Sequence, residues 1–122
     1  MNRPPSSALR SKSSTSPRRR AEVSDFADRV AQRFSPQRII LFGSHASDTS
    51  SLESDVDILV VLDHHGHPAL KAAEIRRAIP ASFSLDLIVR SPSRIAERLK
   101  LGDPFFSEIC SQGVVLYESA DG

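Results

Sequence analysis

Two aspartates separated by one residue follow a Gly-Ser pair at a spacing of ten residues, and this pattern constrains the fold more than any other feature of the chain. The pair is Gly43-Ser44 and the aspartates are Asp55 and Asp57, with apolar residues before the pair and after the aspartates. The order predicts a strand, a turn with a short helix, and a second strand. Because side chains alternate along a strand, Asp55 and Asp57 should point to one face, about 7 Å apart.

The expected surroundings of these residues suit a polyphosphate and a divalent cation. Two like charges on one strand face repel each other, and magnesium removes that cost because it prefers carboxylate, phosphate and water oxygens. Gly43 allows a phosphate to approach the backbone, and Ser44 can donate its hydroxyl or cap the following helix, whose first amides favour an anion. Taken singly, the Gly-Ser pair is an ordinary turn and the two aspartates are a solvated strand end. Their combination favours a nucleoside triphosphate with magnesium.

Gly43, Ser44, Asp55 and Asp57 match, position by position, the signature of the minimal nucleotidyltransferases of the polymerase-beta superfamily, which the chain resembles over residues 21–118. The resemblance implies the polymerase-beta-like nucleotidyltransferase fold, an α/β structure of the α+β type. Periodicity independently predicts the same class, a small mixed β-sheet with helices packed on it. The resemblance also implies transfer of a nucleotidyl group from ATP or another nucleoside triphosphate, with pyrophosphate leaving.

The resemblance further implies a third carboxylate on a later strand, and the apolar segment 83–89 supplies Asp86. Asp55 and Asp57 would then hold magnesium, and two Mg²⁺ ions are expected. Asp86 would share one of the ions and accept the proton of the acceptor hydroxyl, so all three aspartates would be both catalytic residues and metal ligands. The alternative for Asp86 is an aspartate at a strand end that caps a backbone N–H.

The segment after the Gly-Ser pair departs from the pattern of the superfamily. Many members continue with an arginine and a glycine, whereas this chain reads His45-Ala46-Ser47-Asp48. An arginine that could bind a phosphate through two hydrogen bonds is therefore missing at that place. The departure favours weaker triphosphate binding and leaves the metal site intact. His45 is expected either to contact phosphate or to lie exposed in the turn.

Positive charge is concentrated in residues 1–20, which contain five arginines, one lysine and no acidic residue. This segment is rich in Ser and Pro and has little apolar surface to bury, so we predict a disordered tail that could touch nucleic acid or an acidic partner. A solvated leader is the alternative. The whole chain carries +1 and the residues after the tail therefore carry −5, which argues against broad nucleic-acid binding by the folded domain. A nucleotidyltransferase domain over 21–118 and a short tail over 119–122 complete the predicted organisation.

Apolar periodicity and turn residues predict the other elements. Ser91 and Asp103, each followed by proline, are expected to begin helices, and Gly113 is expected to end one. Cys110, the single cysteine, is expected to be buried on a helix face. The predicted helices cover 22–34, 69–79, 92–101 and 104–113, and the predicted strands cover 38–42, 55–62, 83–89 and 114–117, the last of them at a sheet edge.

A chain of 122 residues leaves no room for the second, helical domain with which larger members of the superfamily bind base and acceptor. A partner subunit or a second copy is therefore expected to complete the site, unless the acceptor is itself a protein. Similar minimal nucleotidyltransferases are antitoxins that pair with a HEPN-domain toxin. No apolar run approaches the roughly 20 residues of a membrane span, and a single cysteine is compatible with the cytoplasm.

Three functional hypotheses stay open at this point. The first is magnesium-dependent transfer of AMP to a hydroxyl of a protein partner such as a HEPN-like toxin. The second is neutralisation of a partner by binding alone, which the changed segment after Gly43-Ser44 favours. The third is transfer to a small molecule such as an antibiotic, against which the missing second domain counts.

Overall fold

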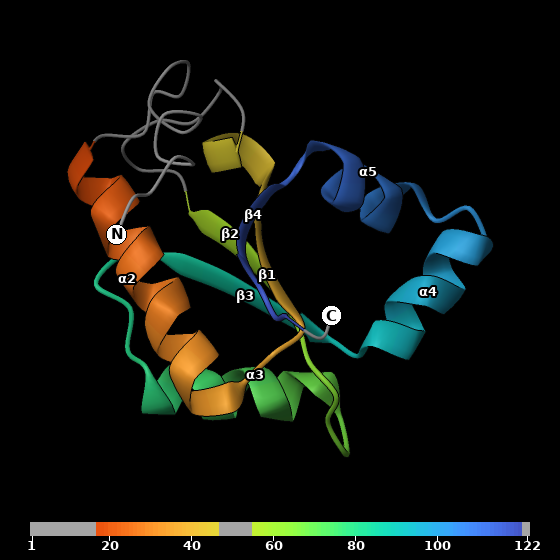
Figure 1. The fold of residues 1–122 in the computed structure, drawn as a ribbon, viewed down its shortest axis with the longest axis horizontal. Helices are drawn as coiled ribbons and strands as arrows, with labels where there is room; N and C mark the ends of the chain where they lie inside the picture. Colours follow the sequence, from red (N-terminus) through yellow and green to blue (C-terminus); the bar gives the residue numbers. More distant parts are fainter. Residues whose placement is uncertain (1–16, 47–54, 121–122) are drawn as a thin grey trace.

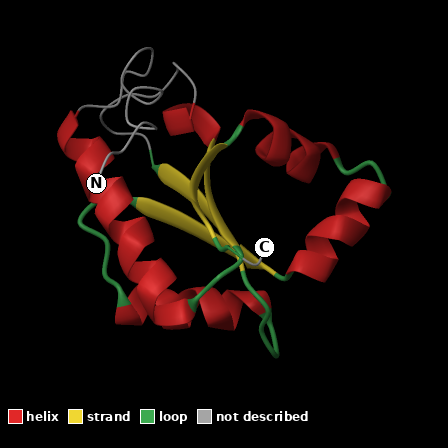
Figure 2. Ribbon diagram, viewed as in Figure 1, coloured by secondary structure: helices red, strands yellow, loops and turns green. Residues whose placement is uncertain are grey.

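A computed structural model describes residues 17–46 and 55–120 of the chain, and Figures 1 and 2 show a central sheet with helices on both sides. The predicted mixed α+β class is confirmed. The strands are β1 (Arg38–Phe42), β2 (Val56–Val61), β3 (Leu85–Arg90) and β4 (Val114–Glu118). The helices are α2 (Pro17–Phe34), the 3₁₀ helix η1 (Gly43–Ala46), α3 (Pro68–Ala78), α4 (Pro92–Lys100) and α5 (Pro104–Gln112).

The strands lie in the order β3-β2-β1-β4, so that β4 is at an edge as predicted. β1 is antiparallel to both of its neighbours, whereas β2 and β3 are parallel. A parallel pair needs a long crossover connection, and α3 provides it between β2 and β3. This crossover brings the start of β3 beside the start of β2, where the predicted carboxylates lie.

Side chains of the central strand β2 alternate between two apolar cores. Val56, Ile58 and Val60 pack in the core beneath α2 and α3, and Leu59 and Val61 pack in the core beneath α4 and α5. Figure 1 shows the two helix pairs on opposite sides of the strands. The strand is apolar on both faces because both faces are covered.

The starts of α4 and α5 have the predicted caps. Ser91 Oγ accepts a hydrogen bond of 3.2 Å from the backbone N–H of Arg94. Asp103 Oδ1 accepts one of 2.8 Å from the N–H of Phe105, and its Oδ2 forms an ion pair of 2.8 Å with Arg98. The hydrogen bond from Arg98 holds the pKa of Asp103 below its ordinary value. Both caps are followed by proline, which has no N–H to leave unpaired in the first turn.

Helix α2 begins earlier than predicted, at Pro17, so that residues 17–20 are helical although we predicted them as tail. Proline at the first helical position favours this start. Arg19 then stabilises the added turn through an ion pair of 3.0 Å with Glu22 and through its guanidinium, which lies 5.7 Å from the ring centre of Phe83. Residues 1–16 of the predicted tail lie outside the described residues.

Of two expectations about α5, one is confirmed and the other is wrong. Gly113 does end the helix, but its φ of −73° is not left-handed, so conformational freedom is not the reason for glycine there. A Cβ at this position would lie 2.5 Å from the carbonyl oxygen of Ile109 and 2.6 Å from Cγ2 of Ile40. Glycine is therefore required because the end of α5 presses against β1. Cys110 is exposed rather than buried, because Phe106 and Ile109 occupy the core-facing side of the helix.

No helix in the described parts of the chain is both long enough and apolar enough to span a bilayer.

Gly113→Ala is expected to lower the free energy of unfolding by about 1–3 kcal/mol, because the added methyl group overlaps both the helix end and β1. Urea denaturation followed by circular dichroism measures this change. Gln112→Ala, an exposed change in the preceding residue, should stay within about 0.5 kcal/mol of the parent protein. An unchanged stability of Gly113→Ala would contradict the close packing of α5 on β1.

Candidate active site

Parallel pairing places two of the three predicted carboxylates side by side. Asp57 on β2 is the register partner of Asp86 on β3, and their carboxyl groups share a hydrogen bond. By alternation from Ile58 and Leu87, which lie in the core beneath α2 and α3, both aspartates belong to the opposite face of the sheet. Asp57 is half-buried and Asp86 is exposed, so the pair is open to solvent from the side of β3.

The surroundings raise the pKa of Asp57 above its ordinary value of 3.8. Burial is the largest cause, followed by the negative charges of Asp86 and Asp55 and by the hydrogen bond to Asp86, while the charge of His45 opposes the rise. Two neighbouring carboxyl groups of this kind repel each other when both are ionised. Their oxygens can together bind a divalent cation, and magnesium in proteins is often bound through one or two carboxylates.

Asp55 lies just before β2 and is exposed. Its Oδ1 accepts a hydrogen bond from the hydroxyl of Ser84, the residue before β3. Among residues 17–46 and 55–120, no three or more His, Cys, Asp or Glu side chains are gathered closely enough to hold a metal ion together. The structure therefore brings Asp57 and Asp86 into contact and leaves Asp55 as an electrostatic neighbour of Asp57, held to the adjacent strand.

The Gly-Ser turn lies directly against Asp57. Gly43 has a φ of +78°, which other residues rarely adopt. A Cβ at Gly43 would overlap Oδ2 of Asp57 and lie 3.1 Å from its Cγ, so glycine is needed both for the turn and for the close approach of the carboxylate. Ser44 follows in η1 and is half-buried. The predicted short helix is a single 3₁₀ turn within the described residues, and Ser47 and Asp48 lie outside them.

His45 is buried, with 3% of its surface exposed, and the expectation that it could lie exposed in the turn is wrong. Its charge acts on Asp57 in the direction that favours the carboxylate form. A cationic group beside two or three carboxylates reduces their mutual repulsion. His45 lies two residues after Gly43, and this proximity made it a candidate site residue. The sequence could not show that η1 turns its side chain inward.

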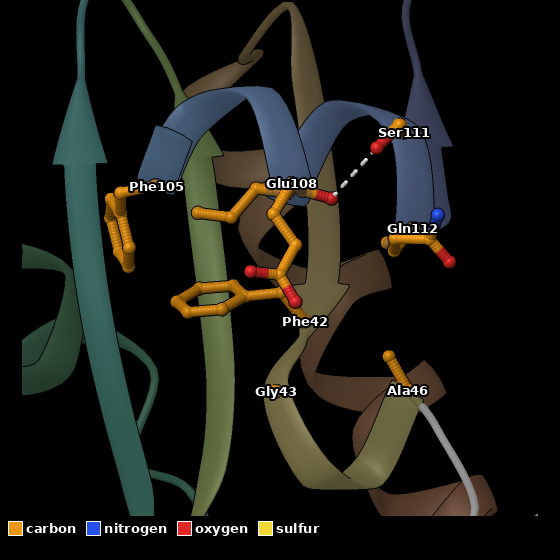
Figure 3. Close-up of a pocket in the computed structure, with 9 residues that line it drawn as sticks. Phe42, Gly43, Ala46, Phe105, Glu108, Ser111 and Gln112 are labelled. Carbon is orange, nitrogen blue, oxygen red and sulfur yellow. Dashed lines mark hydrogen bonds between the residues drawn. The ribbon is translucent and has the colours of Figure 1, made fainter. Parts of the chain in front are cut away.

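A cavity of about 910 Å³ adjoins the turn, and sequence reasoning missed it. Figure 3 shows it between the end of β1 with η1 on one side and α5 on the other. Gly43 belongs both to the wall of this cavity and to the contact with Asp57, so the cavity and the carboxylates are neighbours. The cavity is lined by residues that include Phe42, Gly43, Ala46, Phe105, Glu108 and Gln112.

Comparison with known proteins agrees with this geometry. Residues 23–115 match the family model described as a nucleotidyltransferase domain. The fold is similar to the crystal structure of a candidate nucleotidyltransferase from Sulfolobus solfataricus, with a TM-score of 0.63 and 17% sequence identity over 100% of this chain and 94% of that chain. No curated protein matches the sequence. At 17% sequence identity, the structural similarity is evidence for a shared fold only.

Asp57→Asn is expected to raise the free energy of unfolding of the metal-free protein at pH 7 by up to about 1 kcal/mol, a figure that allows for solvent screening. The raised pKa means that the folded protein binds the proton of the Asp57 carboxyl group more tightly than the unfolded chain does. The resulting stability is fully present below the ordinary pKa and is lost as the pH rises through the raised pKa. Asparagine cannot ionise and avoids that loss.

Urea denaturation with a chelator at pH 4 and pH 7 measures this effect, and the gain should shrink at the lower pH. Asp63→Asn, a change at an exposed aspartate beyond the other end of β2, is the matched control. An Asp57→Asn protein that is less stable than the parent protein at pH 7 would show that the carboxylate is not under electrostatic strain.

Proposed function

The chain belongs to the family of nucleotidyltransferase domains, and from this premise we propose that it transfers AMP from ATP to a hydroxyl group of a protein partner. The observation that supports the reaction is the Asp57–Asp86 pair, set against the backbone of Gly43. Magnesium would bind at the paired carboxylates, and a phosphate would bind beside it against the backbone of Gly43. The neighbouring cavity leaves space for the rest of the nucleotide.

Magnesium is the cofactor in this proposal. Asp57 and Asp86 are the residues that would hold it, since they are register partners on adjacent strands and their carboxyl groups interact. Asp55 would add a ligand to this ion or to a second one, because its charge acts on Asp57 from the same strand end. When bound, the cation would neutralise phosphate charge and stabilise the leaving pyrophosphate.

Residues of the protein would bind the phosphates and accept the proton of the acceptor. Gly43 would let the phosphates lie close to the backbone, and the Ser44 hydroxyl would bind one of them. Asp86, the exposed member of the pair, would accept the proton of the acceptor hydroxyl. The hydroxyl oxygen forms a bond to the α-phosphorus, the bond from that phosphorus to the bridging oxygen of the β-phosphate breaks, and pyrophosphate leaves with the electron pair.

A large acceptor fits the exposure of the site better than a small one. Asp86 and Asp55 are both exposed, so a hydroxyl carried by another protein can reach them without entering a closed pocket. The resemblance to antitoxins of the minimal nucleotidyltransferase family makes a HEPN-like toxin in the cytoplasm the proposed partner. The site would then be completed by the other protein in a hetero-oligomer or by a second copy of this chain.

Binding without transfer is the second candidate function. The described residues contain no preformed set of three acidic metal ligands, and this favours slow chemistry or none. In this case the domain would neutralise its partner by forming a complex. Incubation with labelled ATP, Mg²⁺ and a purified HEPN-type partner separates the two functions, since only transfer leaves AMP on the partner.

Asp57→Asn is expected to lower the transfer of label at least about 100-fold, because the mutation removes a ligand charge at the reacting phosphate. The folded state should be retained, and Asp63→Asn should transfer label at the rate of the parent protein. Full activity of Asp57→Asn would refute the assignment of this carboxylate. A tight but unlabelled complex formed by the parent protein would instead support binding alone.

Ser44→Ala is expected to reduce transfer about tenfold, because one hydrogen bond to a charged phosphate oxygen is lost. Loss of one side-chain hydrogen bond in the turn costs about 1 kcal/mol, so the melting temperature should fall by no more than about 4–8 °C. Initial rates at several ATP concentrations and a thermal melt without nucleotide are the measurements. A large fall in melting temperature with unchanged rates would make Ser44 a structural residue only.

A further inference from the structure

The cavity beside Gly43 has a lining that distinguishes it from a phosphate site. We propose that it binds the base of the nucleotide, which stacks on Phe105 and directs its amino group to the carboxylate of Glu108. This inference rests on the proposed function and adds to it the part of the protein that recognises the base. It assigns roles to α5, a helix that carries none of the three aspartates.

The cavity has the position and size that a base requires. Its wall includes Gly43, whose backbone also lies against Asp57, so a nucleotide with its phosphates at the aspartates would have its base within reach of the cavity. A volume of about 910 Å³ holds a base with its ribose, since small-molecule sites commonly measure about 300–1,000 Å³.

Phe105 offers the base an aromatic surface. It begins α5 and lines the cavity, and 45% of its surface is exposed although the residue is a large hydrophobic one. The ring of Phe42 meets the ring of Phe105 edge to face, at 5.8 Å between centres and 90° between planes. This contact fixes the orientation of Phe105 and leaves part of its ring accessible. Base stacking on such a ring is favourable for every base.

Glu108 would select a base that carries an amino group. Figure 3 shows its side chain extending from α5 toward Phe42 and the Gly43 turn. Within residues 17–46 and 55–120 its carboxylate has no hydrogen bond or ion pair, while its backbone carbonyl accepts a hydrogen bond of 3.4 Å from the Ser111 hydroxyl. An ionised carboxylate only accepts hydrogen bonds. It therefore repels phosphate and attracts N–H groups, such as the 6-amino group of adenine.

Calorimetric titration in the presence of Mg²⁺ tests the inference with three ligands: ATP, purine riboside triphosphate, which lacks only the 6-amino group, and inorganic tripolyphosphate. The parent protein is expected to bind ATP about ten- to a hundredfold more tightly than purine riboside triphosphate, the effect of one hydrogen bond to a charged group. Tripolyphosphate should bind more weakly than both because it has no base.

Three variants assign the contacts. Phe105→Ala should weaken ATP binding about tenfold and leave tripolyphosphate binding unchanged. Glu108→Ala should make ATP and purine riboside triphosphate bind equally, whereas Glu108→Gln should keep part of the preference because its amide oxygen still accepts a hydrogen bond. Leu70→Ala, a truncation of an exposed apolar residue on α3, is the matched control and should change none of the affinities. Thermal melts verify that each variant is folded.

The outcomes separate failure of the inference from failure of the proposed function. If ATP binds no more tightly than tripolyphosphate and the variants change nothing, the cavity does not hold the base and the phosphate site stands. If Phe105→Ala slows transfer but leaves ATP binding intact, the cavity holds the acceptor and the inference is wrong. If neither ATP nor tripolyphosphate binds the parent protein, the proposed function fails and the inference falls with it.

Discussion

The contact between Asp57 and Asp86 is the constraint on which the rest of the site depends. Parallel pairing of β2 and β3 places the two carboxyl groups at the same level, and burial of Asp57 makes their repulsion costly. The charge of His45 acts in the opposite direction and favours the ionised form of Asp57. Two carboxyl groups held together in this way favour the binding of a cation, because a bound cation would replace their repulsion with attraction.

The fold sustains this pair because each face of β2 is covered by its own helices. Neighbouring residues of one strand serve two different cores, with Ile58 on the side of α2 and α3 and Leu59 on the side of α4 and α5. A slip of the register by one residue would exchange these two sets and turn Asp57 toward the wrong core. The same packing that stabilises the sheet therefore fixes the carboxylate at its open end.

Local features of the sequence predicted the elements well, whereas features that depend on distant segments could not be predicted from it. The Ser91 and Asp103 caps and the spacing from Gly43 to Asp57 were readable because they lie in short stretches of chain. The inward direction of His45 was not readable, since it depends on how η1 meets β2. The cavity was missed for a similar reason, because its walls come from residues about sixty positions apart.

Gly113 forms a tightly packed part of the cavity wall. The end of α5 lies so close to Ile40 that a methyl group on Gly113 would overlap it. Phe105, at the other end of the helix, is partly exposed, and its ring meets the ring of Phe42 edge to face. Because the end of α5 cannot move closer to β1, adaptation to ligands of different bulk would fall to the side chains that line the cavity, such as Phe105.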